Sequence, residues 1–196
     1  MARTGPTTND STTVKLGLAQ IRVLDSATNI AEKDAVGETT DSIGTLSMTK
    51  YTGDTEFYKL ESGFPLSTDA YFPLRENASI ECGIREMTPY NWALIYGIDP
   101  VGSYTEEHSG EINLGARVTP AYLRMEAHYT YPDGSNKMYI IFPRAVVTST
   151  VEEDSQLEEA SSVPVTFTAT PADDSVTDGN AAWNSAPLGR IYWAEA

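Results

Sequence analysis

The stretch that most constrains the fold is residues 138–170, which holds two runs rich in β-branched and aromatic residues. Such a composition suits a pleated, half-buried strand. In the second run Val163, Val165 and Phe167 are apolar, and the threonines between them would line the opposite face. Pro143 interrupts the first run, which predicts an edge or a bulge near it. The stretch therefore predicts two strands joined by a solvated, acidic turn.

The same patterns predict further strands along the chain. They are expected at residues 14–24, 43–51, 55–61, 71–85, 111–118, 122–131 and 188–193, and the first run of the opening stretch extends over 137–150. The pair 43–51 and 55–61 is expected to form a hairpin that turns near Gly53 and Asp54. The clearest amphipathic strand is 71–85. It is longer than the usual five or six residues, so we expect it to run the height of a barrel or to continue across two sheets.

One short helix is predicted after the strand at 71–85. Thr88 can cap it, Pro89 suits its first turn, and Gly97 can end it. Its apolar residues need a sheet to cover. The predicted fold is mainly β: a β-sandwich or open barrel with one short α-helix. We expect a single domain over residues 14–196, after a flexible N-terminal arm at 1–13.

Composition limits the classes of function. The chain has 196 residues and a net charge of −15, which argues against a protein that grips nucleic acid through its phosphates. Cys82 is the only cysteine, so we expect a small buried hydrophobe rather than a disulfide or a zinc cluster. No secretory signal or membrane-spanning run is visible, so we expect a soluble protein of a reducing cytoplasm.

The sequence contains few patterns that are typical of catalytic or metal-binding sites. His108 and His128 lie in no spaced metal motif, and no nucleophile elbow, Walker loop or dinucleotide fingerprint occurs. The acidic residues 173–179 lack the spacing of a calcium loop, which favours a solvated turn. We therefore expect no catalytic residues, no metal and no cofactor.

Three polar strand faces are stronger candidates for a functional surface than these motifs. They comprise Arg75, Asn77, Ser79 and Glu81; Arg124, Glu126, His128 and Thr130; and Thr166, Thr168 and Thr170. Each can be the wet side of a sandwich, or can line a channel in a barrel shared between subunits. The residues alone favour the sandwich.

Several segments, in this order and spacing, resemble the tail tube proteins of tailed bacteriophages. They are residues 14–22, 57–65, 73–76, 85–91, 141–145 and 187–190, together with the order of strands, one short helix and strands. The resemblance covers roughly residues 14–193.

The resemblance implies a structural role without an active site. Subunits of that family form rings, usually hexameric, that stack into a hollow tube, and each inner sheet completes a multi-subunit barrel. Pairing across subunits satisfies sheet edges. The implied location is the virion tail, after assembly in the host cytoplasm. DNA would pass during ejection without specific binding and without membrane contact. Sheath, tail terminator or baseplate proteins are further implied partners.

This hypothesis assigns residues to two surfaces. The candidate lumen-facing residues are Arg75, Asn77, Ser79, Glu81, Arg124, Glu126, His128, Thr166 and Thr168. The candidate ring-stacking loops are 25–41, 62–70 and 99–110, represented by Asp25, Asp41, Phe64, Pro65, Asp99 and Glu106. No motif fixes which face lines the lumen. The alternative is a virion-surface or adhesin-like β-sandwich that binds a partner through 99–110 or 171–187. A hydrolase with a carboxylate pair ranks last.

Overall fold

In the part of the chain that the structure describes, the strands form one antiparallel sheet of seven strands, which confirms the predicted mainly-β fold. The computed structural model describes residues 15, 17–98, 111–112, 114–115, 120–153 and 160–194. The strands are β1 (Gln20–Asp25), β2 (Leu46–Ser62), β3 (Ser67–Ile84), β4 (Leu123–Thr130), β5 (Lys137–Val147), β6 (Val163–Ala169) and β7 (Arg190–Ala194). The helices are α1 (Ser26–Asn29) and α2 (Pro89–Ile95), with short 3-10 turns η2 (Thr39–Asp41) and η3 (Ala181–Trp183).

Strand β5 folds the sheet over on itself. The strand order is β1-β4-β5-β6-β3-β2, and β7 also pairs with β5. The first part of β5 lies between β4 and β7, whereas its end pairs with β6 from Ala145 onward. The register of β4 against β5 shifts between two of its residue pairs, Met125 with Phe142 and Leu123 with Ala145. Between these pairs the chain advances by three residues on β5 and by two on β4. This bulge contains Pro143, as predicted, and a bulge bends its strand.

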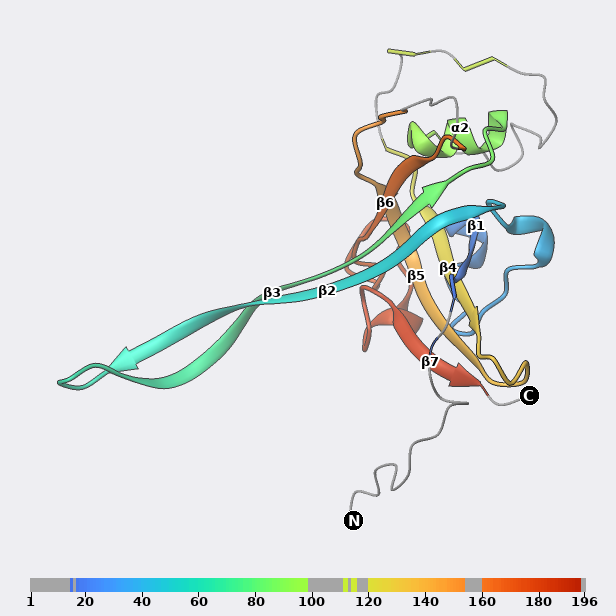
Figure 1. The fold of residues 1–196 in the computed structure, drawn as a ribbon. Coiled ribbons are helices and arrows are strands. Elements are labelled where there is room, and N and C mark those ends of the chain that lie inside the picture. The colour runs from blue at the N-terminus through green and yellow to red at the C-terminus, as the bar shows by residue number, and fades with distance from the viewer. Residues whose placement is uncertain are drawn as a thin grey trace.

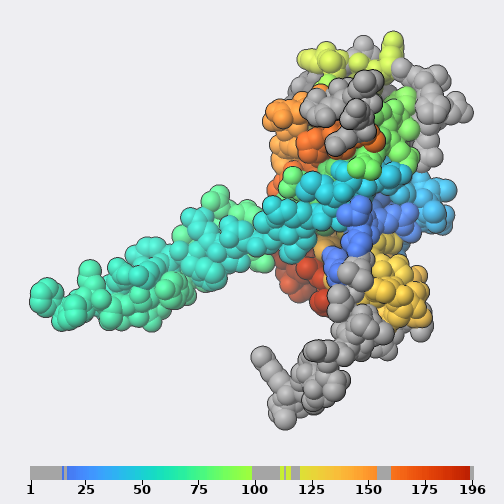
Figure 2. Space-filling view, in the orientation of Figure 1, coloured from blue at the N-terminus to red at the C-terminus, as the bar shows by residue number. Residues whose placement is uncertain are grey.

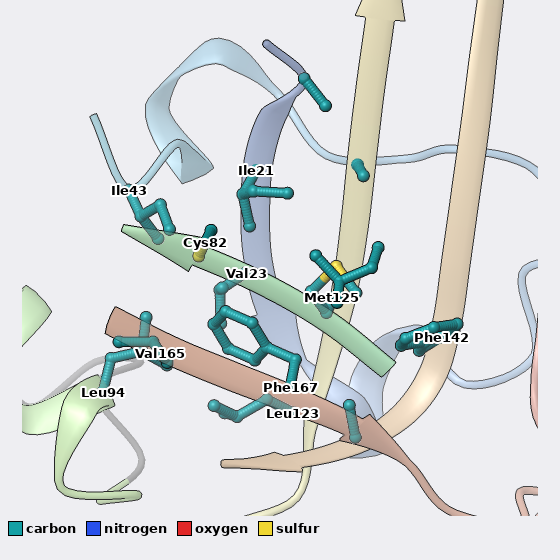
Figure 3. Close-up of a cluster of buried hydrophobic side chains, with 14 of the residues drawn as sticks. Ile21, Val23, Ile43, Cys82, Leu94, Leu123, Met125, Phe142, Val165 and Phe167 are labelled. Atoms are coloured by element: carbon teal, nitrogen blue, oxygen red, sulfur yellow. The ribbon is translucent and has the colours of Figure 1, made fainter. Parts of the chain in front are cut away.

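The core lies between two halves of the folded sheet. One half holds β1, β4, β7 and the first part of β5, and the other holds β2, β3, β6 and the end of β5. Figure 3 shows β3 and β6 crossing over β1 and β4, with apolar side chains from all four strands between them. Ile21, Met125 and Phe167 are fully buried there. Cys82 is also fully buried, as predicted, and burial raises the pKa of its thiol to about 12, with Glu81 nearby as a smaller cause.

Helix α2 covers the top of this core, as Figure 1 shows. The Thr88 side chain accepts a hydrogen bond from the backbone amide three residues later, and Pro89 occupies the first turn. Gly97 follows the helix with a φ of 63°, a left-handed conformation that favours glycine. Leu94 and Ile95 are buried in the core. The predicted helix is therefore confirmed, whereas the four-residue α1 was not predicted.

The hairpin predicted at Gly53 and Asp54 is wrong. These residues pair with Ala78 and Asn77, so β2 continues through them as one strand of 17 residues. Continuing the ladder keeps the backbone groups of both strands paired. The chain turns at residues 63–66 instead, where Gly63 has a φ of 87°. The loop predicted at 62–70 is correspondingly shorter.

Two other predicted strands differ from the structure, one where it begins and one in its described residues. The first strand begins at Gln20 rather than at residue 14, and residues 14 and 16 lie outside the described part of the chain. Of the strand predicted at 111–118, residues 111, 112, 114 and 115 are described, and none of them lies in a strand.

Phe167→Ala tests the assignment of the core. We expect a loss of about 3–5 kcal/mol in the free energy of unfolding, because the truncation removes a fully buried ring and leaves a cavity. Chemical denaturation followed by circular dichroism measures it. The control is Thr166→Ala, on the opposite face of the same strand, with an expected cost of about 1 kcal/mol at most. Equal losses in the two variants would contradict the assignment.

Candidate assembly surface

A two-stranded ribbon projects from the folded sheet, as Figures 1 and 2 show. We define the ribbon as residues 54–77, the part of β2 and β3 that lies beyond the other strands. Strand β3 pairs with β6 only from Ser79 onward, so among the described residues each strand of the ribbon has only the other as partner. Two strands without a third strand or a helix against them are marginally stable in water. The ribbon therefore needs a further surface to pack against.

The ribbon carries much of the exposed apolar surface. Eight of the fifteen exposed large apolar side chains in the described part of the chain lie on it: Phe57, Tyr58, Leu60, Phe64, Leu66, Tyr71, Phe72 and Leu74. Tyr58 lies opposite Phe72, and Phe57 lies opposite Pro73 at the next position of the ladder. Because successive strand residues point to opposite faces, the ribbon is apolar on both faces. Apolar patches of this kind mark interaction sites.

Two of the predicted ring-stacking residues lie at the tip of the ribbon. Phe64 and Pro65 occupy the turn between β2 and β3, and Phe64 is fully exposed. A phenylalanine ring in water at the end of a projecting element is available to a partner. The tip thus has the exposure that a stacking contact requires, although stacking itself stays a prediction.

Six of the nine predicted lumen-facing residues lie on one continuous surface. Arg75, Asn77, Ser79 and Glu81 of β3 lie opposite Glu56, Asp54, Thr52 and Lys50 of β2, and Ser79 and Glu81 lie opposite Thr168 and Thr166 of β6. We call these ten residues the β2–β3–β6 polar face. It is a hydroxyl-rich surface with three carboxylates and two cations. Arg75 donates to Glu56 at 2.7 Å across it.

The other three predicted residues lie on β4, in the other half of the folded sheet. Arg124 and Glu126 are fully buried, so the prediction that they face an open lumen is wrong. The alternation along β4 correctly places them away from the core, but a segment of the same chain covers that side. His128 is only partly buried and lies at the margin of the covered region.

Residues 26–38, which we call the covering segment, lie over Arg124. Its Nη1 donates to the carbonyl oxygens of Asn29 and Glu32 at 2.8 and 2.5 Å, and its Nη2 donates to that of Asp34 at 2.7 Å. Its Nε donates to Glu126 at 2.7 Å. A single guanidinium thereby satisfies three backbone carbonyls of a segment that has little regular structure of its own.

Glu126 binds the next part of the covering segment. One oxygen accepts from the Val36 amide at 3.1 Å and from Arg124; the other accepts from the Gly37 amide at 2.9 Å and from His128 Nε2 at 2.8 Å. Burial alone would raise the pKa of the Glu126 carboxyl. The hydrogen bonds from His128, from the two amides and from Arg124 outweigh it and hold the pKa at about 2, below its ordinary value of 4.5.

Side chains from the C-terminal part of the chain also hold the covering segment. Trp183 donates its indole N–H to the Ile30 carbonyl, the Tyr192 hydroxyl accepts from the Ala35 amide at 2.7 Å, and Arg190 pairs with Asp34 at 2.9 Å. Trp183 is fully buried in a second apolar cluster with Ile30. The polar connection predicted at 25–41 is thus bound to the sheet along most of its length.

The predicted stacking residues at the ends of this connection have local roles. Asp25 accepts from the Ala27 amide at 2.9 Å and caps α1, and Asp41 accepts from the Glu38 amide at 2.6 Å at η2. Such contacts are ordinary caps. The third predicted loop, with Asp99 and Glu106, lies outside the described residues, as does the N-terminal arm at 1–13.

Two features of this surface were missed by sequence reasoning. The ribbon was missed because exposed and buried apolar residues look alike in a strand pattern; the unusual length of the strand at 71–85 was the available signal. The burial of Arg124 and Glu126 was missed because alternation does not show whether another segment covers a polar face. The polar composition of residues 25–41 gave no sign of it.

A scan against models of known protein families finds none that matches this chain, and a search of curated proteins finds no similar sequence. Within the described residues no three His, Cys, Asp or Glu side chains gather as metal ligands would. Among those residues there is also no helix whose length and apolar content would let it cross a bilayer.

Glu126→Gln tests the buried network through its pH dependence. At neutral pH we expect a loss of about 3 kcal/mol or more, because Arg124 remains buried without its counter-charge. A carboxyl with a lowered pKa contributes stability above its unfolded value near 4.5, and that contribution disappears as pH falls toward 2. The difference between wild type and variant should therefore shrink over that range.

Urea unfolding at several pH values measures this difference. The matched control is Glu152→Gln, an exposed glutamate outside the network, which should follow the wild type. A gap between the wild type and Glu126→Gln that stays constant from pH 6 to pH 3 would contradict the assigned role.

Proposed function

We propose that this protein is a structural subunit that assembles with copies of itself into stacked rings, forming the hollow tube of a phage tail through which DNA is ejected. The observation that carries the proposal is the β2–β3 ribbon, which projects from the body with apolar side chains exposed on both faces. The resemblance of segments 14–22, 57–65, 73–76, 85–91, 141–145 and 187–190 to tail tube proteins adds the kind of assembly.

The ribbon favours a large and stable contact. Full burial of one large apolar side chain is worth about 1.5–3 kcal/mol, and eight such side chains on the ribbon are at least partly open to water. Only part of that gain appears as affinity, because association also costs freedom of motion. The same contact would be repeated around a ring and between rings, so its stabilising free energy would sum over the copies in the assembly.

The unpaired edge of β2 favours a partner that adds a strand to the sheet. Strand β2 is the last strand of its half, so one of its edges has no strand beside it in the described part of the chain. Unpaired edges invite pairing with another chain. A second copy offers a strand of the same length and character. Repetition of one head-to-tail contact closes rings or extends filaments.

The β2–β3–β6 polar face suits the wall of a conduit. It continues from the body onto the base of the ribbon, so lining and assembly would use adjacent parts of the same two strands. Its three carboxylates and two cations are interspersed, and its hydroxyls are uncharged. DNA binds tightly to surfaces that present many Lys and Arg side chains. A mixed, slightly negative wall would let DNA pass without holding it.

The alternative is a binding module on a virion surface, with the ribbon docked onto a different protein. The same exposed side chains would serve it. It differs in the assembly state, because the isolated protein would then remain a monomer or small oligomer at every concentration.

Leu74→Ser tests the proposed role of the ribbon. We expect wild-type protein to sediment faster as its concentration rises and to show rings with a central hole by electron microscopy. The variant should associate at least about tenfold more weakly, because one buried leucine is worth more than the roughly 1.4 kcal/mol of a tenfold change.

The control is Leu114→Ser, which changes a leucine of similar exposure outside the ribbon: 66% of Leu114 is exposed and 62% of Leu74. Circular dichroism of both variants checks that the fold is kept. A wild-type protein that stays monomeric at all concentrations would refute self-assembly, and equal losses in the two variants would refute the role of the ribbon.

A further inference from the structure

A cavity of about 350 Å³ opens beside the covering segment, on the outer side of β1, β4 and β5. Gln20, His128 and Tyr139 lie side by side across these three strands and form its floor. Gly37 of the covering segment forms part of its wall. The hydrogen bonds of Glu126 to the covering segment fix that wall, so the cavity has a defined shape in the folded chain.

The charge of this cavity is opposite to that of the protein. Among the described residues its lining includes Arg22 and Lys137 but no Asp or Glu, although the chain as a whole has 28 acidic and 13 basic residues. Within the described residues neither cation forms an ion pair. Lys15 adds a further positive charge nearby, 4.9 Å from the centre of the Tyr129 ring in the lining.

Arg22 is held in place with donors to spare. Its Nε and Nη2 donate to Gln20 Oε1 at 3.3 and 2.9 Å, and its Nη1 donates to the Gly37 carbonyl. A guanidinium has five N–H donors, so two remain after the three bonds that it makes to described residues. The Glu126 carboxylate lies close to Gly37 of the cavity wall, but it is fully buried and already accepts four hydrogen bonds.

We propose that this cavity is a binding site for an oxyanion, a carboxylate or phosphate group, with Arg22 and Lys137 as the cations of its lining. The volume lies in the range of small-molecule sites, roughly 300–1,000 Å³. Charge-assisted hydrogen bonds to a fixed guanidinium are strong and directional. The oxyanion can belong to a free small molecule or to an Asp or Glu side chain of a second copy, and the chemistry of recognition is the same. The site does not depend on the tube function proposed above.

Titration calorimetry of the full chain with citrate, and separately with inorganic phosphate, tests this site at low and constant ionic strength. We expect saturable binding of at least one of these anions at one site per chain. Lys137→Gln should weaken the affinity about fivefold to tenfold, as expected for one lost charged contact. The matched control is Lys50→Gln, an exposed lysine on the β2–β3–β6 polar face, which should bind as the wild type does.

Arg22→Gln provides a second variant and should weaken binding by at least as much as Lys137→Gln. Because Arg22 also holds Gly37, thermal unfolding of this variant is measured alongside. The proposal is overturned if neither anion binds saturably, or if Lys50→Gln and Lys137→Gln lower the affinity equally.

Sedimentation of the same variants separates the two sources of the oxyanion. If a side chain of a second copy occupies the site, citrate and Lys137→Gln both weaken self-association. If a free anion is the ligand, binding occurs and self-association is unchanged by either. A protein that binds citrate through Lys137 yet never associates would leave this site established while refuting the tube.

Discussion

The buried, ionised carboxylate of Glu126 determines how much of the molecule must form together. A carboxylate without water keeps its charge only if donors surround it, and here two donors come from β4 and two from backbone amides of residues 36 and 37. Arg124 extends the same arrangement to the carbonyls of residues 29, 32 and 34. The outer side of β4 and the covering segment therefore satisfy each other, and neither is complete alone.

This arrangement gives β4 two different buried sides. One side contributes Met125 and Tyr129 to the apolar core, where packing stabilises the fold. The other side holds the ion pair of Arg124 and Glu126, whose contribution to stability depends on its geometry rather than on the apolar area that it buries. The bulge at Pro143 in the neighbouring strand lets β5 leave this half of the sheet and join β6. The half of the sheet that contains β4 and binds the covering segment thus shares one core with the half that extends into the ribbon.

The sequence predicts the local elements well where a single physical rule decides them. Alternation identifies β6, the capping threonine and proline identify α2, and Pro143 identifies the bulge. It fails where the outcome depends on distant parts of the chain. The pair Gly53 and Asp54 suits a turn, yet β3 is long enough to continue the ladder past it. The same limit applies to the candidate site. Alternation correctly assigns the polar residues of β3 to one face of that strand and the threonines of β6 to one face of theirs, but only the fold joins these two faces and separates them from Arg124 and Glu126.

The hydrogen-bonded ladder that runs from the ribbon into the body has a mechanical consequence. Strand β3 is continuous from the ribbon to the core, and there it is bonded along its length to β6, which is bonded in turn to β5. A pull along the ribbon axis would load these bonds in parallel, so that many must break at once. A sideways pull would open them one after another. The protein is therefore built to resist tension along the direction in which the ribbon extends, and to yield more readily to peeling.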